Sequence, residues 1–239
     1  MKKIGLLGGM SYQSTELYYR IVNEEVNRKL GSLHSAKLVL DSVDFQEVME
    51  MQHSGDWDAA AGVLIDSAQN IEKAGADMLL ICTNTMHKVA AQVQESIQIP
   101  LLHVADATAR KIQKSGFKRV GFLGTKFSME DSFYTGRLKD QFGFEVFTPN
   151  KQDRDFIHKV IYEELCLGIV NDESRKHFLR IISDLNAQGA ECIIEGCTEI
   201  VMLIQQIHTD IPLFDTTAIH AEEAVAIALS ESALTRYSV

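Results

Sequence analysis

The chain has 239 residues, of which 46% are hydrophobic, enough for one large or two modest globular domains. Its formal net charge is −10, and no cluster of Lys and Arg marks a surface for phosphates, so a nucleic-acid partner is not expected. No segment approaches the length of a membrane span, and the opening apolar run is too short for a signal peptide, so we expect a cytoplasmic protein without membrane contact.

The expected elements alternate between strands and helices along the chain. Apolar runs and helical periodicity in the first half predict strand 4–7, a helix ending near 30, strand 37–43, a polar loop 44–56, helix 59–73, a strand beginning at 75, helix 87–96, strand 99–104 and helix 107–114. The second half predicts strand 119–123, helices 129–141, 153–167 and 172–188, a strand beginning at 189, strand 211–214 and helix 218–229. This alternation predicts an α/β fold with parallel sheets covered by helices on both faces.

A repeat relates the two halves of the chain. The stretch GADMLLICTNTM, residues 75–86, matches GAECIIEGCTEI, residues 189–200. Three glycine or proline pairs recur in the same order at offsets of 116, 114 and 112 residues, namely Gly5 with Gly121, Gly75 with Gly189 and Pro100 with Pro212. Two copies are too few for a solenoid, so we expect two pseudo-symmetric lobes, residues 1–107 plus 216–239 and residues 108–215.

The first glycine-containing turn, residues 8–11, has two interpretations. Such a turn before a helix can direct backbone N–H groups at an anion. It lacks the GxGxxG fingerprint, so dinucleotide binding is not favoured, and a tight turn without a ligand is the equal alternative.

The cysteines give no metal signature. Cys82, Cys166 and Cys192 lie inside apolar runs, which is typical of reduced, buried side chains in a cytoplasmic protein. None of the four has CxxC spacing or a companion His pair, so no metal site is expected. Cys197 differs because it lies beyond the apolar run, between Gly196 and Thr198.

The matched stretches end in polar tips that indicate a site. Aligned from their glycines, they place Cys197 opposite Thr83. Ligands of parallel α/β sheets bind beyond the carboxyl ends of the strands, so we expect both tips to meet in one cleft between the lobes. A thiol between a strand and a helix is a candidate base or nucleophile, because backbone N–H groups and the helix dipole favour its thiolate. A Cys–His pair is less favoured, since only His87 lies near a tip.

Four motifs resemble those of the aspartate/glutamate racemase family. They are GLLGGMS near the start, TNTMH at residues 83–87, GT at 124–125 and EGCTEI at 195–200, and the match covers nearly the whole chain in order. The resemblance implies an isomerase with a small dicarboxylic amino acid as substrate, an active site between two α/β lobes, and assembly as a homodimer. It also implies racemisation by two cysteines that move a proton at Cα, without pyridoxal phosphate or any other cofactor.

The first tip departs from the family pattern, which has C-N-T-x-H where this chain has T-N-T-M-H. Thr83 stands in the position of the cysteine, and its hydroxyl is a poor base at neutral pH although it can relay a proton. Cys82 does not replace the missing thiol, because adjacent residues of a strand point to opposite faces. The resemblance therefore assigns Cys197 and Thr83 as the catalytic pair, with Cys197 acting on the L-enantiomer and turnover faster from the L side.

The resemblance also assigns the substrate-binding groups. They are Met10, Ser11, Gln52, Asn84, Thr85, Thr125, Thr198 and Glu199. Gln52 and Leu167 stand near positions where relatives place an arginine and a lysine, so the side-chain carboxylate of the substrate would lack a bidentate partner. Aspartate and glutamate would therefore both fit, with Lys126 as a candidate charge partner.

Two further functions are compatible with Thr83 in the first tip. One is a dicarboxylate decarboxylase or cis–trans isomerase that uses the single cysteine. The other is a non-catalytic protein that binds amino acids and has lost turnover. Chiral separation of the products after incubation with L-aspartate and L-glutamate distinguishes these from a racemase.

Overall fold

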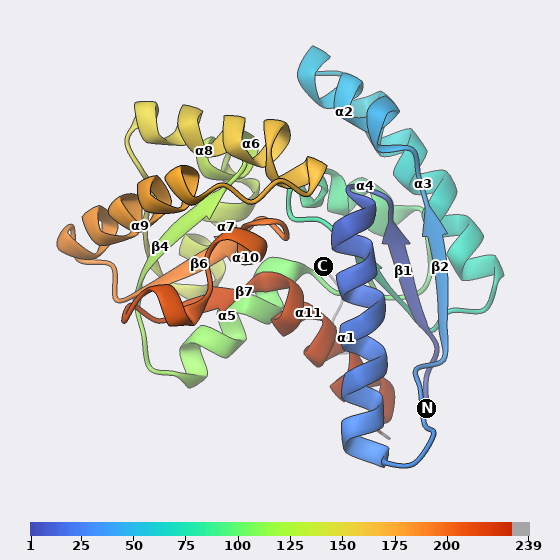
Figure 1. Cartoon of the computed structure of the whole chain (residues 1–239). Coiled ribbons are helices and arrows are strands. Elements are labelled where there is room, and N and C mark those ends of the chain that lie inside the picture. The colour runs from blue at the N-terminus through green and yellow to red at the C-terminus, as the bar shows by residue number, and fades with distance from the viewer. Residues whose placement is uncertain (231–239) are drawn as a thin grey trace. The chain divides into compact units, whose positions relative to one another are not determined.

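The computed structural model describes residues 1–230, and the chain divides into two compact units, each an α/β structure (Figure 1). Unit 1 comprises Met1–Val104 and the described residues 220–230, and unit 2 comprises Ala105–Ile219. Residues 105–107 and 216–219, which the sequence pattern assigned to the first lobe, are grouped with unit 2. Residues 231–239 of the predicted first lobe lie outside the described residues.

Unit 1 contains a parallel sheet of three strands in the order β2–β1–β3, with helices on both faces. Its elements are β1 (Ile4–Gly8), α1 (Tyr12–Leu30), β2 (Leu38–Ser42), α2 (Phe45–Ser54), α3 (Trp57–Lys73), β3 (Met78–Ile81), the 3-10 turn η1 (Thr85–Val89) and α4 (Ala90–Glu95). Alternate strand residues point to opposite faces. Leu7 packs with Leu64 of α3, whereas Leu6 packs with Tyr18 of α1 and Val225 of α11 (Thr216–Leu229).

Unit 2 contains a parallel sheet of four strands in the order β5–β4–β6–β7. Its elements are α5 (Val104–Lys114), β4 (Arg119–Gly124), α6 (Lys126–Glu130), α7 (Ser132–Phe142), β5 (Glu145–Phe147), α8 (Lys151–Glu163), η2 (Leu165–Leu167), α9 (Asp172–Ala187), β6 (Cys192–Gly196), α10 (Ile200–Leu203), η3 (Gln206–His208) and β7 (Leu213–Asp215). Helices α6, α8 and α9 contact β4, and Tyr134 of α7 packs its ring on Phe122 of β4 at 4.6 Å between centroids. The two parallel sheets confirm the predicted α/β class.

The longest described helix, α1, has 19 residues and is amphipathic. Tyr18, Val22 and Val26 are buried at four-residue steps, while Glu16 and Arg20 are exposed. None of the described helices is long and apolar enough to cross a membrane.

The repeated Gly-Ala-acid motif makes the same backbone contacts in both units. The Asp77 carboxylate accepts the Lys3 backbone N–H at 2.6 Å, and the Glu191 carboxylate accepts the Arg119 N–H at 3.0 Å. In return, the N–H groups of Asp77 and Glu191 donate to the carbonyls of Lys3 and Arg119, both at 2.8 Å. The motif therefore fixes the alignment of the first and third strands in each unit.

The predicted strand 99–104 is wrong, although its counterpart in unit 2 is a strand. Leu79 donates to the Pro100 carbonyl at 2.9 Å, as Ile193 donates to Pro212 at 2.8 Å, so both segments start alike. In unit 1 the pairing is confined to a single bridge between Leu79 and Leu101, because the chain turns into helix α5 at Val104. In unit 2 it continues as β7.

The polar loop expected between residues 44 and 56 is a helix for most of its length, so that prediction is wrong. Asp44 caps the amino end of α2 by accepting the Gln46 N–H at 2.9 Å. Gly55 ends the helix in the left-handed region at φ 78°. Val48 is fully buried in the core, and Phe45 and Met51 of the same helix pack against that core while partly exposed.

The last residue of β6, Gly196, has no room for a side chain. A Cβ there would lie 2.3 Å from ring atoms of Phe122 and 2.8 Å from the Leu123 carbonyl. We expect Gly196→Ala to lower the free energy of unfolding by about 1–3 kcal/mol, because the ring and the strand must shift. Gly62→Ala is the matched control: this exposed glycine of α3 has open space around it. The control should gain about 0.5–1 kcal/mol in urea unfolding, whereas an unchanged Gly196→Ala would contradict the packing account.

Candidate functional site

In unit 1, the predicted residues of the first turn and the first tip lie at one edge of the sheet. Strands β1 and β3 are parallel neighbours, so Met10 and Ser11 follow one strand end and Thr83 follows the other. Ser14 links them, because its hydroxyl lies 2.9 Å from the Ser11 carbonyl and 3.2 Å from the Cys82 carbonyl. The first turn and the first tip therefore lie side by side at the carboxyl ends of β1 and β3.

The first turn uses much of its polar capacity internally. The Gly9 N–H donates to the Thr15 hydroxyl at 2.8 Å, so this group is engaged within the protein. Gly9 has φ 97°, and a Cβ there would lie 2.1 Å from the Val43 carbonyl. Ser11 caps α1 by accepting the Ser14 N–H at 3.3 Å, so this side chain too is engaged at the start of the helix.

The first tip is closely packed. Thr83, Asn84 and Thr85 are 9%, 2% and 5% exposed, and the Thr83 carbonyl lies 2.8 Å from Nδ1 of His87. Cys82 is fully buried in the cluster that contains Tyr18, and this burial raises the pKa of its thiol far above the ordinary value. Cys82 is thus a core residue, as its position in an apolar run predicts.

Gln52 lies beside this tip, although on a helix rather than in the expected loop. Its side chain extends from α2, is 3% exposed, and donates from Nε2 to the sulfur of Met86 at 2.9 Å. Met86 belongs to η1, which continues from the tip. The contact fixes the amide of Gln52 at the carboxyl edge of the sheet in unit 1.

In unit 2, the second tip carries a hydrogen-bonded group of three residues. The Cys197 thiol lies 3.0 Å from Oε2 of Glu199, and the Thr198 hydroxyl donates to the same oxygen at 2.8 Å. All three side chains are buried, with Cys197 the most accessible at 7%. One carboxylate oxygen therefore orients both the thiol and the hydroxyl.

The surroundings of Cys197 favour the neutral thiol, contrary to the expectation from a strand-to-helix junction. Burial is the main cause that raises the pKa of Cys197 well above its ordinary value, and the negative charge of Glu199 is the next. The backbone N–H of Glu199 acts in the opposite direction but is outweighed. Helix α10 has only four residues, so it adds little dipole to oppose the burial.

A segment at the end of α8 also lies close to Cys197. Tyr162 and Cys166 both have a pKa raised mainly by burial, and the charge of Glu199 contributes at each. Cys166 is only partly buried, unlike the fully buried thiol that its apolar run predicts. Leu167 follows Cys166 in the 3-10 turn η2 and is 67% exposed. The position that relatives fill with a lysine therefore carries an exposed apolar side chain.

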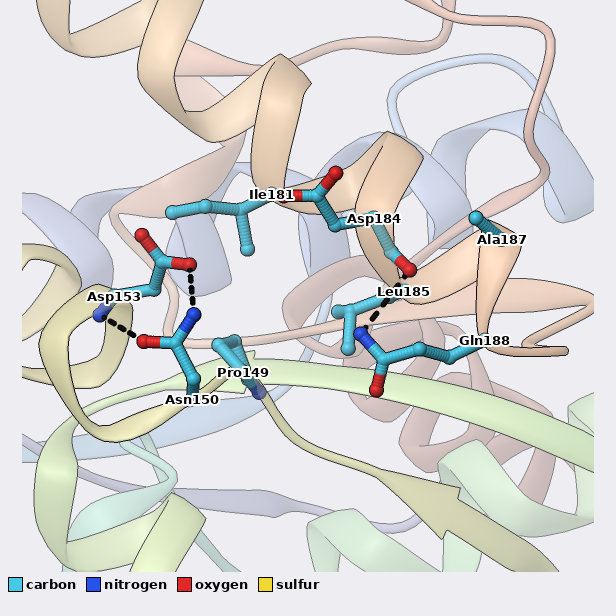
Figure 2. A pocket seen from close by; sticks show the side chains of 8 residues that line it. All are labelled: Pro149, Asn150, Asp153, Ile181, Asp184, Leu185, Ala187 and Gln188. Carbon is cyan, nitrogen blue, oxygen red and sulfur yellow. Dashed lines mark hydrogen bonds between the residues drawn. The ribbon is translucent and has the colours of Figure 1, made fainter.

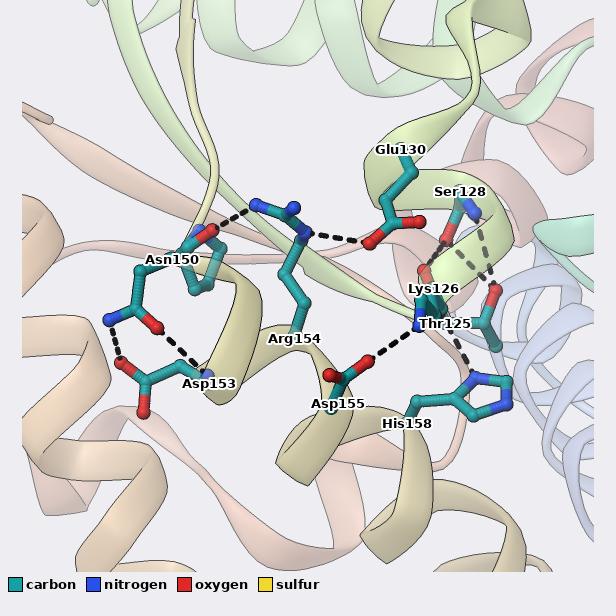
Figure 3. Close-up of polar contacts among 10 residues, drawn as sticks. Thr125, Lys126, Ser128, Glu130, Asn150, Asp153, Arg154, Asp155 and His158 are labelled. Carbon is teal, nitrogen blue, oxygen red and sulfur yellow. Dashed lines mark hydrogen bonds and ion pairs between the residues drawn. The ribbon is translucent and has the colours of Figure 1, made fainter.

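Thr125 and Lys126 form the start of α6 (Figure 3). Thr125 follows β4, the neighbour of β6, and its hydroxyl caps the helix at 3.4 Å from the Ser128 N–H. The Lys126 ammonium lies 2.6 Å from the Asp155 carboxylate, and this pairing raises the pKa of Lys126. The lysine that the sequence suggested for the substrate is thus engaged with a carboxylate of α8.

Sequence reasoning assigned no role to Glu195, although it is an acid inside an apolar run. It is 3% exposed on β6, it lies in register with Asp215 of β7, and its Oε1 accepts no hydrogen bond. Burial, followed by the negative charge of Asp215, raises the pKa of Glu195 to about 8. A protonated carboxyl therefore lies two residues before Cys197 at neutral pH.

A cavity of about 310 Å³ lies elsewhere in unit 2, between α8 and α9 (Figure 2). Its polar side chains already have partners: Asn150 bonds Asp153 at 2.7 Å, and Gln188 bonds the Asp184 carbonyl at 3.1 Å. None of the predicted site residues lines it. Among the described residues, no group of three His, Cys, Asp or Glu side chains is placed to hold a metal ion.

Comparison with known proteins relates nearly the whole chain to racemases. The family model for Asp/Glu/hydantoin racemases matches residues 7–224. A Yersinia pestis protein assigned to the Asp/Glu racemases is 50% identical, with a TM-score of 0.90 over 96% of this chain and 100% of that one. An aspartate racemase homologue from Pyrococcus horikoshii is 32% identical, with a TM-score of 0.81 over 96% and 100%. The broad-specificity amino-acid racemase RacX of Bacillus subtilis is 25% identical over 95% of this chain and 98% of its own.

The buried Glu195 should make stability depend on pH. Because the folded state holds its proton more tightly than the unfolded chain, whose carboxyl has the ordinary pKa of 4.5, the free energy of unfolding falls as pH rises toward about 8. Between about pH 5 and pH 8 we expect the wild type to lose roughly 3 kcal/mol more than Glu195→Gln. Glu163→Gln, at a side chain that is 65% exposed, is the control and should follow the wild type. Parallel pH curves for the wild type and Glu195→Gln would refute this.

Proposed function

The chain belongs to the Asp/Glu/hydantoin racemase family and is a racemase-type isomerase, and on that premise we propose that it racemises L-aspartate and L-glutamate. The observation that carries the proposal is the unequal pair of tips. A thiol held by a carboxylate ends one strand, and a hydroxyl occupies the matched position of the repeat, at Cys197 and Thr83. Family membership favours this function over a decarboxylase or a non-catalytic binding protein.

The proposed reaction moves one proton away from Cα and returns another on the opposite face. The Cys197 thiolate takes the Cα proton of the L-substrate, and the electron pair of the broken C–H bond is delocalised into the α-carboxylate. The Thr83 hydroxyl, or water relayed through it, supplies a proton to the other face and so gives the D-enantiomer. No oxidant, reductant or cofactor is needed, because the step breaks one C–H bond and forms one.

Formation of the thiolate is the costly step in this scheme. Burial and the charge of Glu199 hold Cys197 in its neutral form, so its proton must leave before catalysis. The proton must reach solvent, and the Glu199 carboxylate, 3.0 Å from the sulfur, is the first acceptor that the described contacts provide on that path. The α-ammonium group of a bound amino acid would further favour the thiolate, since an opposite charge stabilises the ionised form.

Weak selection between the two acidic amino acids follows from the groups proposed to bind them. Thr125, Asn84 and Gln52 are neutral, and the ammonium of Lys126 is paired with Asp155. Neutral donors hold a carboxylate less tightly than a bidentate arginine does. The broad specificity named for the Bacillus subtilis relative supports the same proposal.

Replacing the two catalytic residues tests the proposal directly. We expect Cys197→Ala to abolish racemisation of L-aspartate, because the variant lacks the group that takes the Cα proton of the L-enantiomer. Thr83→Cys should bring the two directions closer together, because a thiol is a far better base than a hydroxyl. Chiral chromatography measures the products, and deuterium incorporation at Cα from each enantiomer measures the two half-reactions. An active Cys197→Ala enzyme, or equally rapid exchange from the D side in the wild type, would contradict the assignment.

The raised pKa of Cys197 predicts that activity increases with pH. Since the base must be deprotonated, kcat/KM for L-aspartate should rise by about tenfold per pH unit between roughly pH 6 and pH 8. Glu199→Gln removes a negative charge that raises the pKa of Cys197, so the rising limb should move to lower pH. A pH-independent kcat/KM, or a limb moved to higher pH by Glu199→Gln, would show that Cys197 is not the titrating base.

A further inference from the structure

The tautomer of His87 is fixed by two backbone groups. Its Nδ1 lies 2.8 Å from the Thr83 carbonyl, and its Nε2 lies 3.2 Å from the Val104 N–H. A carbonyl oxygen only accepts and a backbone N–H only donates, so Nδ1 carries the proton and Nε2 is the acceptor. The imidazole is therefore neutral, with both nitrogens engaged by the backbone, and it is not available as a general base for Cys197.

This ring joins the first tip to the start of α5, which lies 17 residues further along the chain. Thr83 follows β3, His87 belongs to η1, and Val104 is the first residue of α5 and the last residue of the first segment of unit 1. A single side chain thus ties the strand end that carries the hydroxyl to the point where the chain leaves the unit. If either backbone group moved, its own hydrogen bond to the imidazole would be lost, and the other bond alone would hold the ring.

Neighbouring rings hold the imidazole in place. His87 is 3% exposed, and its ring centroid lies 4.6 Å from that of His103 and 6.0 Å from that of His220. His220 is itself fixed, since its Nε2 must donate to the Leu102 carbonyl at 2.7 Å and its Nδ1 then accepts from the Tyr18 hydroxyl at 2.9 Å. The tip is therefore built on a packed cluster of histidines rather than on a flexible loop.

Given the proposed role of Thr83, we propose that His87 is a positioning residue that sets the direction of the Thr83 side chain. It acts through the Thr83 carbonyl, which fixes the backbone from which the hydroxyl projects. Proton transfer depends steeply on geometry, and a displacement of about 1 Å can cost up to about 100-fold in rate. Loss of the His87 to Thr83 bond should therefore impair the step at the second face of the substrate and spare proton removal by Cys197.

Two amide variants separate the two hydrogen bonds. In His87→Asn, the amide nitrogen can take the place of Nδ1 and keep the bond to Thr83. In His87→Gln, the amide oxygen can take the place of Nε2 and keep the bond to Val104. We expect His87→Gln to form D-aspartate from L-aspartate about tenfold to 100-fold more slowly, while deuterium still enters Cα of recovered L-aspartate at a rate near that of the wild type. His87→Asn should form D-aspartate within about threefold of the wild type, because the Thr83 bond is kept.

The outcomes distinguish this inference from the proposed function. If the wild type forms no D-aspartate and incorporates no deuterium, the proposed function fails and this inference with it. If the wild type is active but His87→Gln loses racemisation and deuterium entry in parallel, or loses neither, the positioning role alone is overturned. Should both variants unfold, nitrogen-15 shifts of His87 in the wild type still decide the matter, since an Nε2-protonated ring would refute the assigned contacts.

Discussion

The register of the inner strands is the constraint on which both units depend. In each unit, an acidic side chain at the start of the third strand accepts a backbone N–H at the start of the first, through Asp77 in unit 1 and Glu191 in unit 2. A one-residue slip in a strand exchanges its two faces, so these bonds also decide which side chains are buried. With the same register in both units, Thr83 and Cys197 follow their strands at matched positions in their own sheets.

The two tips use different means to hold a reactive group. In unit 2, the Glu199 carboxylate orients the Cys197 thiol and raises its pKa, so the thiol is held in place but kept neutral. In unit 1, the His87 imidazole forms a hydrogen bond with the backbone carbonyl of Thr83. A thiol can be switched on by a change in nearby charge, whereas a hydroxyl stays protonated at neutral pH and depends on placement. The two kinds of support therefore match the chemistry of the groups they serve.

Much of the fold could be predicted because the two halves of the repeat can be compared with each other. The inner strands and the tips at Thr83 and Cys197 follow from matched glycines and apolar runs. The failures have local causes: α2 has only one fully buried apolar residue, and β5 is a three-residue strand at a sheet edge, too short for a periodic signal. The raised pKa of Cys197 could not be predicted from the sequence either. Its pKa depends on desolvation and on a carboxylate two residues away, and neither burial nor side-chain direction can be read from spacing.

The lone bridge between Leu79 and Leu101 marks the place where the two halves of the repeat differ in structure. Both Ile-Pro-Leu segments accept the same first hydrogen bond, from Leu79 in unit 1 and from Ile193 in unit 2, but only the segment in unit 2 continues into a ladder. The two halves therefore agree in their paired strands and differ beyond them, where His103 of unit 1 packs against the His87 ring at 4.6 Å between centroids. The same segment of the repeat thus adds a strand to the sheet in unit 2, and in unit 1 it leads through the histidine cluster into α5.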